Sequence, residues 1–313
     1  MRTCVIGGGG FIGGYLVETL IATGRDVHVL GRRSERPNGL HALATYRSCD
    51  YGDRSSLRQH ISDCDEIIDL AYATVPQTSF ENPIFDLQAN LAPSVTLLEE
   101  AKQLSRLRRL VVTSSGGTVY GPATRLPIIE DDKTEPISPY GITKLTIERY
   151  ALMFYQLFDL PVTIVRPANA YGLGQRPFTG QGFIATAMGR ILRSQPVTIF
   201  GEDGTTRDYV HVKDIASGVL CAIEYGRPGE IYNLGSGVGR TNRDVLETIE
   251  PFAERNGLAI KIECTQPRSF DVPANVLSYG KILNHANWQP KVPFERGLLE
   301  MWEGMAALLN FDE

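Results

Sequence analysis

No apolar run in this 313-residue sequence is long enough to cross a bilayer, and the glycines of the opening MRTCVIGGGG interrupt any hydrophobic segment of a signal peptide. Long basic runs are also missing: no Lys/Arg run is longer than the pairs Arg32-Arg33 and Arg108-Arg109, and the net charge is −5. We therefore expect neither a membrane nor a nucleic acid as a partner.

Cysteine is scarce, and several motifs that carry chemistry are absent. The five cysteines, at positions 4, 49, 64, 221 and 264, form no CxxC pair, which is typical of small buried residues in a reducing compartment, so we predict a cytoplasmic location. No HExxH, GxSxG or GxxxxGK[ST] pattern and no His/Cys cluster at metal spacing occurs. The sequence thus predicts no metal site.

The chain does contain a regular alternation of short apolar runs and longer helical patterns. In the first half we predict strands at 3–6, 27–30, 66–71, 110–114 and 162–166, and helices at 11–23, 55–61, 84–104 and 139–158. Repeated alternation of strand and helix predicts βαβ units and a parallel sheet. The predicted fold class is therefore α/β, with a Rossmann-like doubly wound parallel sheet.

After about residue 172 the pattern loosens. Helices are predicted at 180–194, 213–225, 242–256 and 295–309, and short strands at 197–200, 230–234 and 259–264. We predict a dinucleotide-binding domain over 1–172 and a smaller mixed α/β domain over 173–313 that covers its active edge. This boundary is soft, because residues 213–234 can return to the first sheet.

The segment TCVIGGGGFIGGYLVETL combines a strand, a glycine turn and an amphipathic helix. Two dinucleotide fingerprints overlap in it: Gly8, Gly10 and Gly13 fit GxGxxG, and Gly7, Gly10 and Gly13 fit GxxGxxG. Glycine is needed because the backbone must turn sharply and approach a pyrophosphate on the helix N-terminus. Between a strand and a helix, this pattern predicts a dinucleotide cofactor.

The end of the second strand selects between NAD and NADP, because an acid there binds the ribose 2′-hydroxyl and an arginine accommodates a 2′-phosphate. The sequence VHVLGRRSER has Gly31, Arg32 and Arg33 at this point, whereas Asp26 is too early and Glu35 lies past the turn. These charges favour NADP. Arg32 could equally stack on adenine or face solvent, so the choice between NAD and NADP stays open.

Tyr140 and Lys144, four residues apart, lie on one face of the predicted helix 139–158. An ammonium beside a phenol favours the phenolate, which lowers the pKa of the tyrosine and makes it a usable base. Tyr209 and Lys213 have the same spacing, but DYVHV alternates and predicts a strand, which would hold these side chains roughly 13 Å apart. We therefore predict that Tyr140 and Lys144 form the catalytic pair.

These features, together with the hydroxyl-rich strand end TSSGGTVYG, resemble a short-chain dehydrogenase/reductase. Further segments narrow the resemblance to the extended branch, and within it to nucleotide-sugar epimerases of the UDP-glucose 4-epimerase type. They are DLAY (69–72), ENP (81–83), SSGGTVYG (114–121), RPANAYG (166–172), RDYVHVKDIA (207–216), YNLGSG (232–237) and WQPKV (288–292). The resemblance covers nearly the whole chain, and RDYVHV is its most specific segment.

The resemblance implies an NAD(P)-dependent epimerase that inverts C4 of a UDP-hexose. In that family the tyrosine matched by Tyr140 takes the proton of the sugar hydroxyl, while nicotinamide takes hydride from the same carbon and later returns it to the other face of the 4-keto sugar. Lys144 matches the lysine that assists it. The implied cofactor-binding residues are Gly7, Gly10, Phe11, Ile12, Gly13, Arg32, Arg33, Asp50, Tyr51, Leu70, Ala71, Tyr72 and Lys144.

The resemblance also implies a site for the UDP-sugar. Asn169, Arg207 and Arg268 match positions that hold the diphosphate, and Asp271 follows in the matching RxxD pattern. Any single arginine could instead be a solvated surface charge; Arg207, within RDYVHV, is the best supported. Asn275 matches a position that restricts the pocket near the sugar C2 group, and its intermediate size predicts that N-acetylhexosamines are accepted besides glucose and galactose.

The strand end lacks one expected hydroxyl. Similar epimerases carry a serine or threonine at the position of Gly116, where it hydrogen-bonds the reacting hydroxyl. We predict that Thr118 supplies this group, because it lies on the same side if the segment is extended. Ser115 is the second candidate, and Ser114 is interpreted as structural.

Other reactions and the quaternary structure follow from the same resemblance. An NADP-dependent nucleotide-4-keto-sugar reductase remains an alternative, whereas dehydratases and decarboxylases need acids where this chain has Gly117 and Thr118. A dinucleotide-binding sensor without catalysis is disfavoured by the intact tyrosine–lysine pair. In similar proteins, helices equivalent to 84–104 and 139–158 pair with a second subunit, which implies a homodimer.

Overall fold

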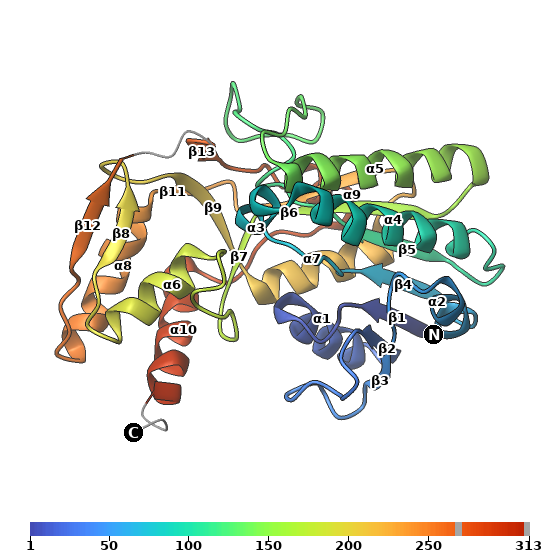
Figure 1. The fold of residues 1–313 in the computed structure, drawn as a ribbon, viewed down its shortest axis with the longest axis horizontal. Coiled ribbons are helices and arrows are strands. Elements are labelled where there is room, and N and C mark those ends of the chain that lie inside the picture. Colours follow the sequence, from blue (N-terminus) through green and yellow to red (C-terminus); the bar gives the residue numbers. More distant parts are fainter. Residues whose placement is uncertain (267–270, 310–313) are drawn as a thin grey trace.

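The structure, a computed structural model, describes residues 1–266 and 271–309. Its centre is a seven-stranded sheet whose neighbouring strands are all parallel, in the order β10-β6-β5-β4-β1-β2-β3 (Figure 1). The strands are β1 (Arg2–Ile6), β2 (Asp26–Gly31), β3 (Thr45–Ser48), β4 (Glu66–Asp69), β5 (Arg109–Thr113), β6 (Val162–Pro167) and β10 (Ile231–Leu234). The chain runs outward from β1 first to one edge and then to the other, so the predicted doubly wound fold is confirmed.

Helices cover both faces of this sheet, and each face has its own core. One face carries α1 (Phe11–Ala22) and α7 (Val212–Tyr225); the other carries α2 (Arg54–Ile61), α4 (Pro83–Ala101) and α5 (Pro139–Phe158). Side chains alternate along a strand, so on β1 Val5 joins the first cluster and Cys4 and Ile6 join the second. Burial on both faces explains the unbroken apolar runs in the sequence.

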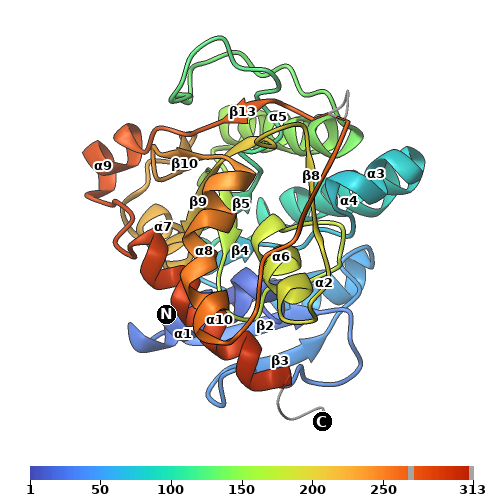
Figure 2. The same ribbon diagram turned by 90° about the vertical axis from the view of Figure 1, so that its left-hand side faces the viewer.

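The C-terminal part encloses a third hydrophobic cluster with α6 (Phe183–Ile191), α8 (Asn242–Arg255) and α10 (Phe294–Leu309). Figure 2 shows these helices in front of the main sheet. Its strands form two small sheets, in which β12 (Ile262–Thr265) pairs with β8 (Val197–Phe200), and β9 (Thr206–His211) pairs with β7 (Asn169–Tyr171), β11 (Gly239–Arg240) and β13 (Ala274–Asn275). The Asn275 amide donates to the Gly116 carbonyl oxygen, which places β13 over the carboxyl end of β5.

Short elements are the main additions to the sequence prediction. They are α3 (Pro76–Glu81), α9 (Gly280–Ala286), β3, β7, β11 and β13, which are too brief for their hydrophobic period to be recognised. Residues 231–234 lie beside β6 in the main sheet, and α7 packs on α1. The division into domains at residue 172 stays a prediction.

The prediction for Tyr209 and Lys213 needs correction, because the strand that holds Tyr209 ends at His211. Lys213 therefore does not share the strand; it lies in the first turn of α7, and its Nζ contacts the Glu300 carboxylate at 2.7 Å. Tyr209 is buried against Tyr171 and Phe294. The two side chains have separate structural partners.

Candidate active site

The glycine turn after β1 forms a close-packed cradle. Gly7 has a φ of 82°, and a Cβ on it would lie 3.0 Å from the backbone nitrogen of Ala71. A Cβ on Gly13 would lie 2.6 Å from the Gly7 carbonyl oxygen, so α1 packs directly on the turn only with glycine there. Gly10 caps α1 without a side-chain hydrogen bond, which leaves the first N–H groups of the helix available. This geometry fits the pyrophosphate of a dinucleotide.

The loop after β2 folds back onto this turn. Pro37 packs against Gly9, where an added Cβ would come within 2.6 Å of the proline Cγ. The loop lines a cavity of about 360 Å³ formed by residues 33–38. This cavity lies beside the end of β2, where the adenosine ribose is predicted.

The arginines of this loop differ in their contacts. Three backbone carbonyls of the loop accept hydrogen bonds from the Arg36 guanidinium, at 2.7, 3.1 and 2.6 Å. Arg32 and Arg33 are exposed, and their side chains make no hydrogen bond or ion pair within residues 1–266 and 271–309. Arg36 thus maintains the loop, while Arg32 and Arg33 are free to bind an anion.

Tyr140 and Lys144 lie one turn apart at the start of α5. The Tyr140 backbone N–H donates to the Ser79 hydroxyl of α3 at 3.1 Å. The Lys144 Nζ donates to the Thr113 carbonyl oxygen, at the end of β5, at 2.7 Å. These contacts fix the beginning of α5 against α3 and against the carboxyl end of β5.

Lys144 is buried, with 5% of its surface exposed, and this burial shifts its pKa. It lowers the pKa of the ammonium to about 8, while the carboxylates of Asp69, Glu148 and Asp86 act in the opposite direction. None of these acids forms an ion pair with Lys144 among the described residues. The positive charge of Lys144 is therefore partly compensated by carboxylates at a distance rather than by an acid in direct contact with it.

The electrostatics of Tyr140 differ from the sequence prediction. Burial raises the pKa of its phenol, a hydrogen bond with Ser115 lowers it, and the Asp86 carboxylate raises it. The expectation that Lys144 lowers the pKa of the tyrosine below its ordinary value is thus wrong for this structure, because burial outweighs the other contributions.

The segment after β5 is a turn, not an extended strand. The Thr118 and Val119 N–H groups donate to the Ser115 carbonyl oxygen at 3.3 and 3.2 Å. The reason for preferring Thr118 is therefore wrong, since side chains alternate only along an extended chain. Ser115 hydrogen-bonds the Tyr140 phenol, whereas the Thr118 Oγ1 is buried without a partner in the described part of the chain. The geometry favours Ser115.

The surroundings of Gly116 explain its missing side chain. A Cβ there would collide with the Leu277 side chain and lie 3.0 Å from the Arg166 carbonyl oxygen. Leu277 reaches this position from the C-terminal part, through an isolated bridge with Ile128. The Leu277 side chain therefore occupies the space that a hydroxyl at position 116 would need. Because Leu277 is far from Gly116 in the sequence, this contact could not be predicted from the sequence.

Three of the predicted substrate residues come together beside this turn. Arg207 of β9 pairs in register with Asn275 of β13. The Asn275 Nδ2 donates to the Gly116 carbonyl oxygen at 3.0 Å. Asn169, the first residue of β7, lies beside Gly117, whose added Cβ would be 3.6 Å from the Asn169 Oδ1. The small sheet thus carries these polar side chains to the end of β5.

The other predicted residues lie around the same edge, with one exception. Phe11 and Ile12 begin α1, residues 70–72 follow β4, and residues 50–51 follow β3. The Tyr51 hydroxyl donates to the Asp69 carboxylate at 2.6 Å, so its side chain is already used. Asp271 is half-buried. Arg268 lies outside the described residues.

Buried polar atoms without partners are concentrated at this edge. Among the described residues they include Thr113 Oγ1, Ser114 Oγ, Thr118 Oγ1, Asn169 Nδ2 and Asn275 Oδ1. Native proteins leave few buried polar groups unsatisfied, so such a group of atoms marks a place for a polar ligand. Ser114, interpreted from the sequence as structural, belongs to this set, and only the fold reveals it.

Two negative findings apply to the described part of the chain. None of its groups of His, Cys, Asp or Glu has three members placed to hold a metal ion. None of its helices is both long and apolar enough to cross a membrane.

Comparison with known proteins identifies the family of this chain. The model of the NAD dependent epimerase/dehydratase family matches residues 3–235. The UDP-glucose 4-epimerase of Mycolicibacterium smegmatis is 32% identical over 315 residues, covering 97% of this chain and 98% of the relative. The sequence-based resemblance is confirmed at the level of the family.

Solved structures and a second relative extend the comparison. The UDP-glucose 4-epimerase of Thermotoga maritima with UDP-glucose has a TM-score of 0.92 and 31% identity, covering 99% of this chain and 100% of that one. The UDP-glucose 4-epimerase of Thermus thermophilus with NAD has a TM-score of 0.89 and 31% identity, covering 97% and 98%. The dTDP-4-dehydro-6-deoxyglucose reductase of Escherichia coli is 27% identical over 304 residues, covering 94% of both chains.

Proposed function

The chain belongs to the NAD dependent epimerase/dehydratase family, and on this premise we propose that it is a nucleotide-sugar 4-epimerase that inverts C4 of a UDP-hexose through a transient 4-keto sugar. The observation that carries the proposal is the pair of half-buried Tyr140 and buried Lys144 at the carboxyl end of β5, where several buried polar atoms have no partner among the described residues. The 31–32% identity to UDP-glucose 4-epimerases along nearly the whole chain supports it.

Tyr140 is the proton-transfer residue in this proposal. Its phenolate accepts the proton of the sugar C4 hydroxyl, and the phenol formed later returns this proton. The Ser115 hydroxyl hydrogen-bonds the phenol and opposes the effect of burial on its pKa. The Lys144 ammonium lies one helical turn away and favours the phenolate by its charge. Bound NAD or NADP would supply the site that takes up and returns the hydride.

The residues of the glycine turn and of the loop after β2 would hold this cofactor. We assign the pyrophosphate to the turn of Gly7, Gly10 and Gly13, because a Cβ at Gly7 or Gly13 would press on neighbouring backbone and open this close-packed turn. Arg32 and Arg33 lie beside the cavity of residues 33–38, and their side chains have no partner within residues 1–266 and 271–309, which favours the 2′-phosphorylated form, NADP.

The choice of cofactor is tested by titrating the purified protein with NADH and NADPH and following the fluorescence of the bound dinucleotide. We expect Arg33→Ala to weaken NADPH binding about tenfold and to leave NADH binding unchanged, because a charge-assisted hydrogen bond to phosphate is lost. Arg106→Ala, at an exposed arginine far from the turn, is the control. Equal weakening of both dinucleotides would show that Arg33 does not contact the 2′-phosphate.

The UDP-sugar is assigned to the other side of the same edge. Arg207 and Asn169 are proposed to bind the diphosphate, and Asn275 to border the sugar near C2. Arg268 and Asp271 are proposed to complete the diphosphate site, as the family resemblance implies. The paired register of Arg207 and Asn275, and the unpartnered Asn169 Nδ2, support this assignment. Its consequence is that UDP-N-acetylhexosamines are accepted besides UDP-glucose and UDP-galactose.

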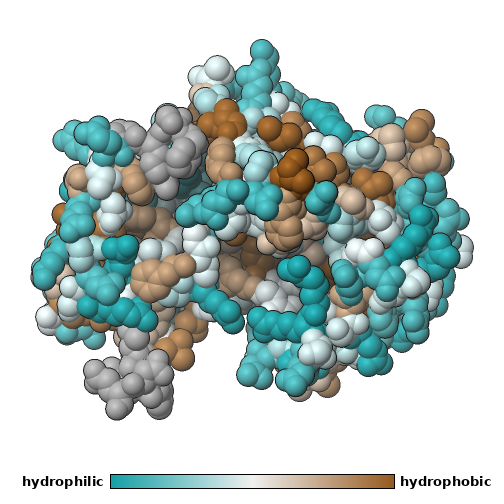
Figure 3. Space-filling view, in the orientation of Figure 1, coloured by the Kyte–Doolittle hydropathy of each residue, from teal (hydrophilic) through white to brown (hydrophobic). Residues whose placement is uncertain are grey.

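A homodimer is proposed from the exposed faces of α4 and α5. Large apolar side chains are exposed there at Ile84, Phe85, Leu87, Ile142, Leu157 and Phe158. Figure 3 shows hydrophobic side chains gathered over these helices, and a hollow near the centre of the same face of the molecule. Adjacent apolar helices of this kind form subunit interfaces. Sedimentation velocity of the purified chain measures the mass directly, and a monomer at micromolar concentration would rule out the dimer.

The reaction is tested by an NMR assay with a panel of UDP-hexoses and identification of any dinucleotide released on denaturation. We expect conversion between the 4-epimers with no net consumption of nicotinamide. Absence of conversion for the non-acetylated pair and the N-acetyl pair alike would refute the epimerase assignment.

A second candidate is an NADPH-dependent reductase of a nucleotide 4-keto-sugar. It is favoured by Arg32 and Arg33, whose side chains have no partner in the described part of the chain, and by the 27% identity to the E. coli reductase. Incubation with a nucleotide 4-keto-6-deoxyhexose separates the two functions. Stoichiometric oxidation of NADPH indicates the reductase, and exchange of epimers without it indicates the epimerase.

A further inference from the structure

Tyr72 has a contact that its predicted role in cofactor binding does not explain. The Lys144 Nζ lies 4.0 Å from the centroid of the Tyr72 ring, compared with 6.0 Å from the centroid of the Tyr140 ring. The Tyr72 and Tyr140 rings are themselves in contact, with centroids 4.7 Å apart and an interplanar angle of 63°. The lysine ammonium is therefore closer to the face of a second tyrosine than to the proposed base.

The donor capacity of Lys144 shows why this contact matters. An ammonium has three N–H donors, and within the described residues one of them is used, by the Thr113 carbonyl oxygen. The Tyr72 ring receives the ammonium on its negative face, and such a contact is strongest when the cation is desolvated. Lys144 is 5% exposed, so water compensates its charge poorly.

The Tyr72 ring is held in place by a buried carboxylate. Asp86 of α4, which is fully buried, accepts a 2.6 Å hydrogen bond from the Thr143 hydroxyl of α5 and a further one from the Thr74 hydroxyl. The Tyr72 hydroxyl lies 3.4 Å from the same carboxylate. Asp86 thus joins α4, α5 and the segment after β4, which are the three elements surrounding the lysine.

We propose that Tyr72, anchored by Asp86, is a positioning residue whose ring face binds the Lys144 ammonium and keeps it protonated beside Tyr140. The proposal rests on the proposed function in one respect, namely that Lys144 assists Tyr140. The Tyr72 ring takes the place of an ion pair, which Lys144 does not form with any described residue, and it leaves a donor of the ammonium for the cofactor or the substrate.

The direction of the effect follows from the charges around Lys144. Burial lowers the pKa of Lys144 to about 8. Asp69 of β4, Glu148 of α5 and Asp86 of α4 raise the pKa, and the Tyr72 ring face adds to them by favouring the charged form. Weakening the ring lowers the pKa of Lys144 further, so a larger fraction of the lysine is neutral near pH 8.

A graded substitution series separates ring electrostatics from shape. Position 72 is changed to Phe and then to 4-fluoro-, 3,5-difluoro- and 3,4,5-trifluorophenylalanine, which withdraw electron density from the ring with little change in size. The pKa of Lys144 is measured by competitive labelling with acetic anhydride as a function of pH, followed by peptide mass spectrometry. This readout does not require activity, so it is independent of whether the protein is an epimerase or a reductase.

We expect Tyr72→Phe to keep the pKa of Lys144 near that of the native protein, and the fluorinated series to lower it stepwise by up to about 1 unit. Tyr72→Leu, which removes the ring, is expected to lower it at least as far. Circular dichroism and thermal melting confirm folding for each variant; if Tyr72→Leu does not fold, the fluorinated series still decides. A pKa that stays the same from Tyr72→Phe through the fluorinated variants would overturn the proposal.

Discussion

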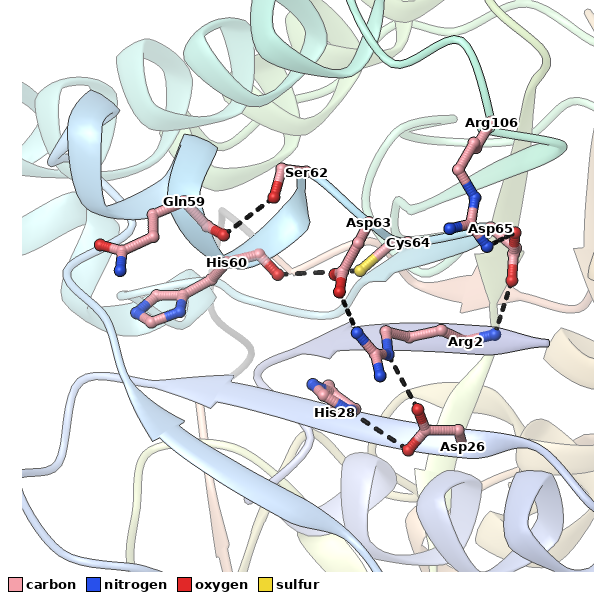
Figure 4. Close-up of polar contacts among 10 residues, drawn as sticks. All are labelled: Arg2, Asp26, His28, Gln59, His60, Ser62, Asp63, Cys64, Asp65 and Arg106. Carbon is pink, nitrogen blue, oxygen red and sulfur yellow. Dashed lines mark hydrogen bonds and ion pairs between the residues drawn. The ribbon is translucent and has the colours of Figure 1, made fainter.

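Polar side chains at one end of the parallel sheet have partners and face solvent, whereas several at the other end are buried and have no partner among the described residues. At the amino ends of β1, β2 and β4, Arg2 donates to Asp26 at 2.8 Å and to Asp63, and its backbone N–H donates to Asp65 at 2.8 Å (Figure 4). Arg106 contacts Asp65 from the other side at 2.9 Å. Every one of these charged side chains has a partner, and the rim is open to solvent, with the Arg2 side chain 34% and the Asp63 side chain 50% exposed.

At the carboxyl ends the arrangement is reversed. Lys144 is buried without an ion pair in the described residues, and the hydroxyls of Thr113, Ser114 and Thr118 are buried without partners. A solvent-exposed rim of satisfied charges contributes little to stability. A buried edge with unsatisfied groups costs stability and is retained where a ligand satisfies it. The difference therefore supports the proposal that the carboxyl ends of the strands form the functional edge, and it does so without reference to any relative.

The largest effect on activity is expected for Tyr140→Phe, at the carboxyl ends of the strands. We expect kcat to fall by about 10³-fold, because the proton-transfer group is lost, while folding is unaffected. The matched control is Tyr209→Phe, the tyrosine of the second Y-x-x-x-K segment, which is buried in the C-terminal cluster. Initial rates with UDP-galactose measure both variants. Full turnover in Tyr140→Phe would sink the catalytic assignment.

The next test distinguishes whether the hydroxyl of Ser115 or that of Thr118 assists Tyr140. Ser115→Ala removes the hydrogen bond to the Tyr140 phenol, and we expect kcat to fall by roughly 10- to 100-fold. Thr118→Val removes a hydroxyl without a partner in the described chain, so an effect of less than about threefold is expected. The same initial-rate assay serves for both. The reverse ranking would restore Thr118 as the bridging residue.

The pH dependence tests the buried lysine. Since burial lowers the pKa of Lys144 to about 8, the ammonium is present below that pH and lost above it. Loss of this proton opposes the rise in kcat/KM that ionisation of Tyr140, whose pKa is raised, would otherwise give between pH 7 and pH 9. We therefore expect kcat/KM of the native enzyme to rise about tenfold less over this range than that of Lys144→Met, whose rate should be low throughout. Equal rises in the two proteins would show that Lys144 does not contribute to the pH profile.

The smallest effect is expected at the amino ends. Arg2→Gln should lower the free energy of unfolding by less than about 1 kcal/mol, and the loss should vanish near 1 M salt, because exposed ion pairs are screened. Hydrogen bonds with Arg2 lower the pKa of Asp26 and Asp65, so their stabilisation is present above the ordinary carboxyl pKa and is lost as the pH falls through the lowered value. Urea unfolding measures the change in the free energy of unfolding. A reduced kcat in Arg2→Gln would mean that the charged residues at the amino ends of the strands affect the active site.

Prediction from the sequence succeeded where the signal is local. The glycine turn, the strands of the first half and helix α5 each have a short-range pattern of spacing and polarity, and the structure confirms these elements. It was wrong where a conclusion depended on local geometry that the pattern does not contain: the segment 115–119 is a turn, and β9 ends before Lys213.

The sequence by itself determined the doubly wound fold, because alternating apolar runs and amphipathic helices leave few ways to bury both faces of a sheet. It also determined the spacing of Tyr140 and Lys144, since helical periodicity places them on one face. Only the tertiary structure decided that Leu277 fills the space beside Gly116, that Ser115 contacts the phenol, and that Tyr72 lies under the Lys144 ammonium. These contacts join segments far apart in the chain, and no local pattern encodes which distant side chain will occupy a given space.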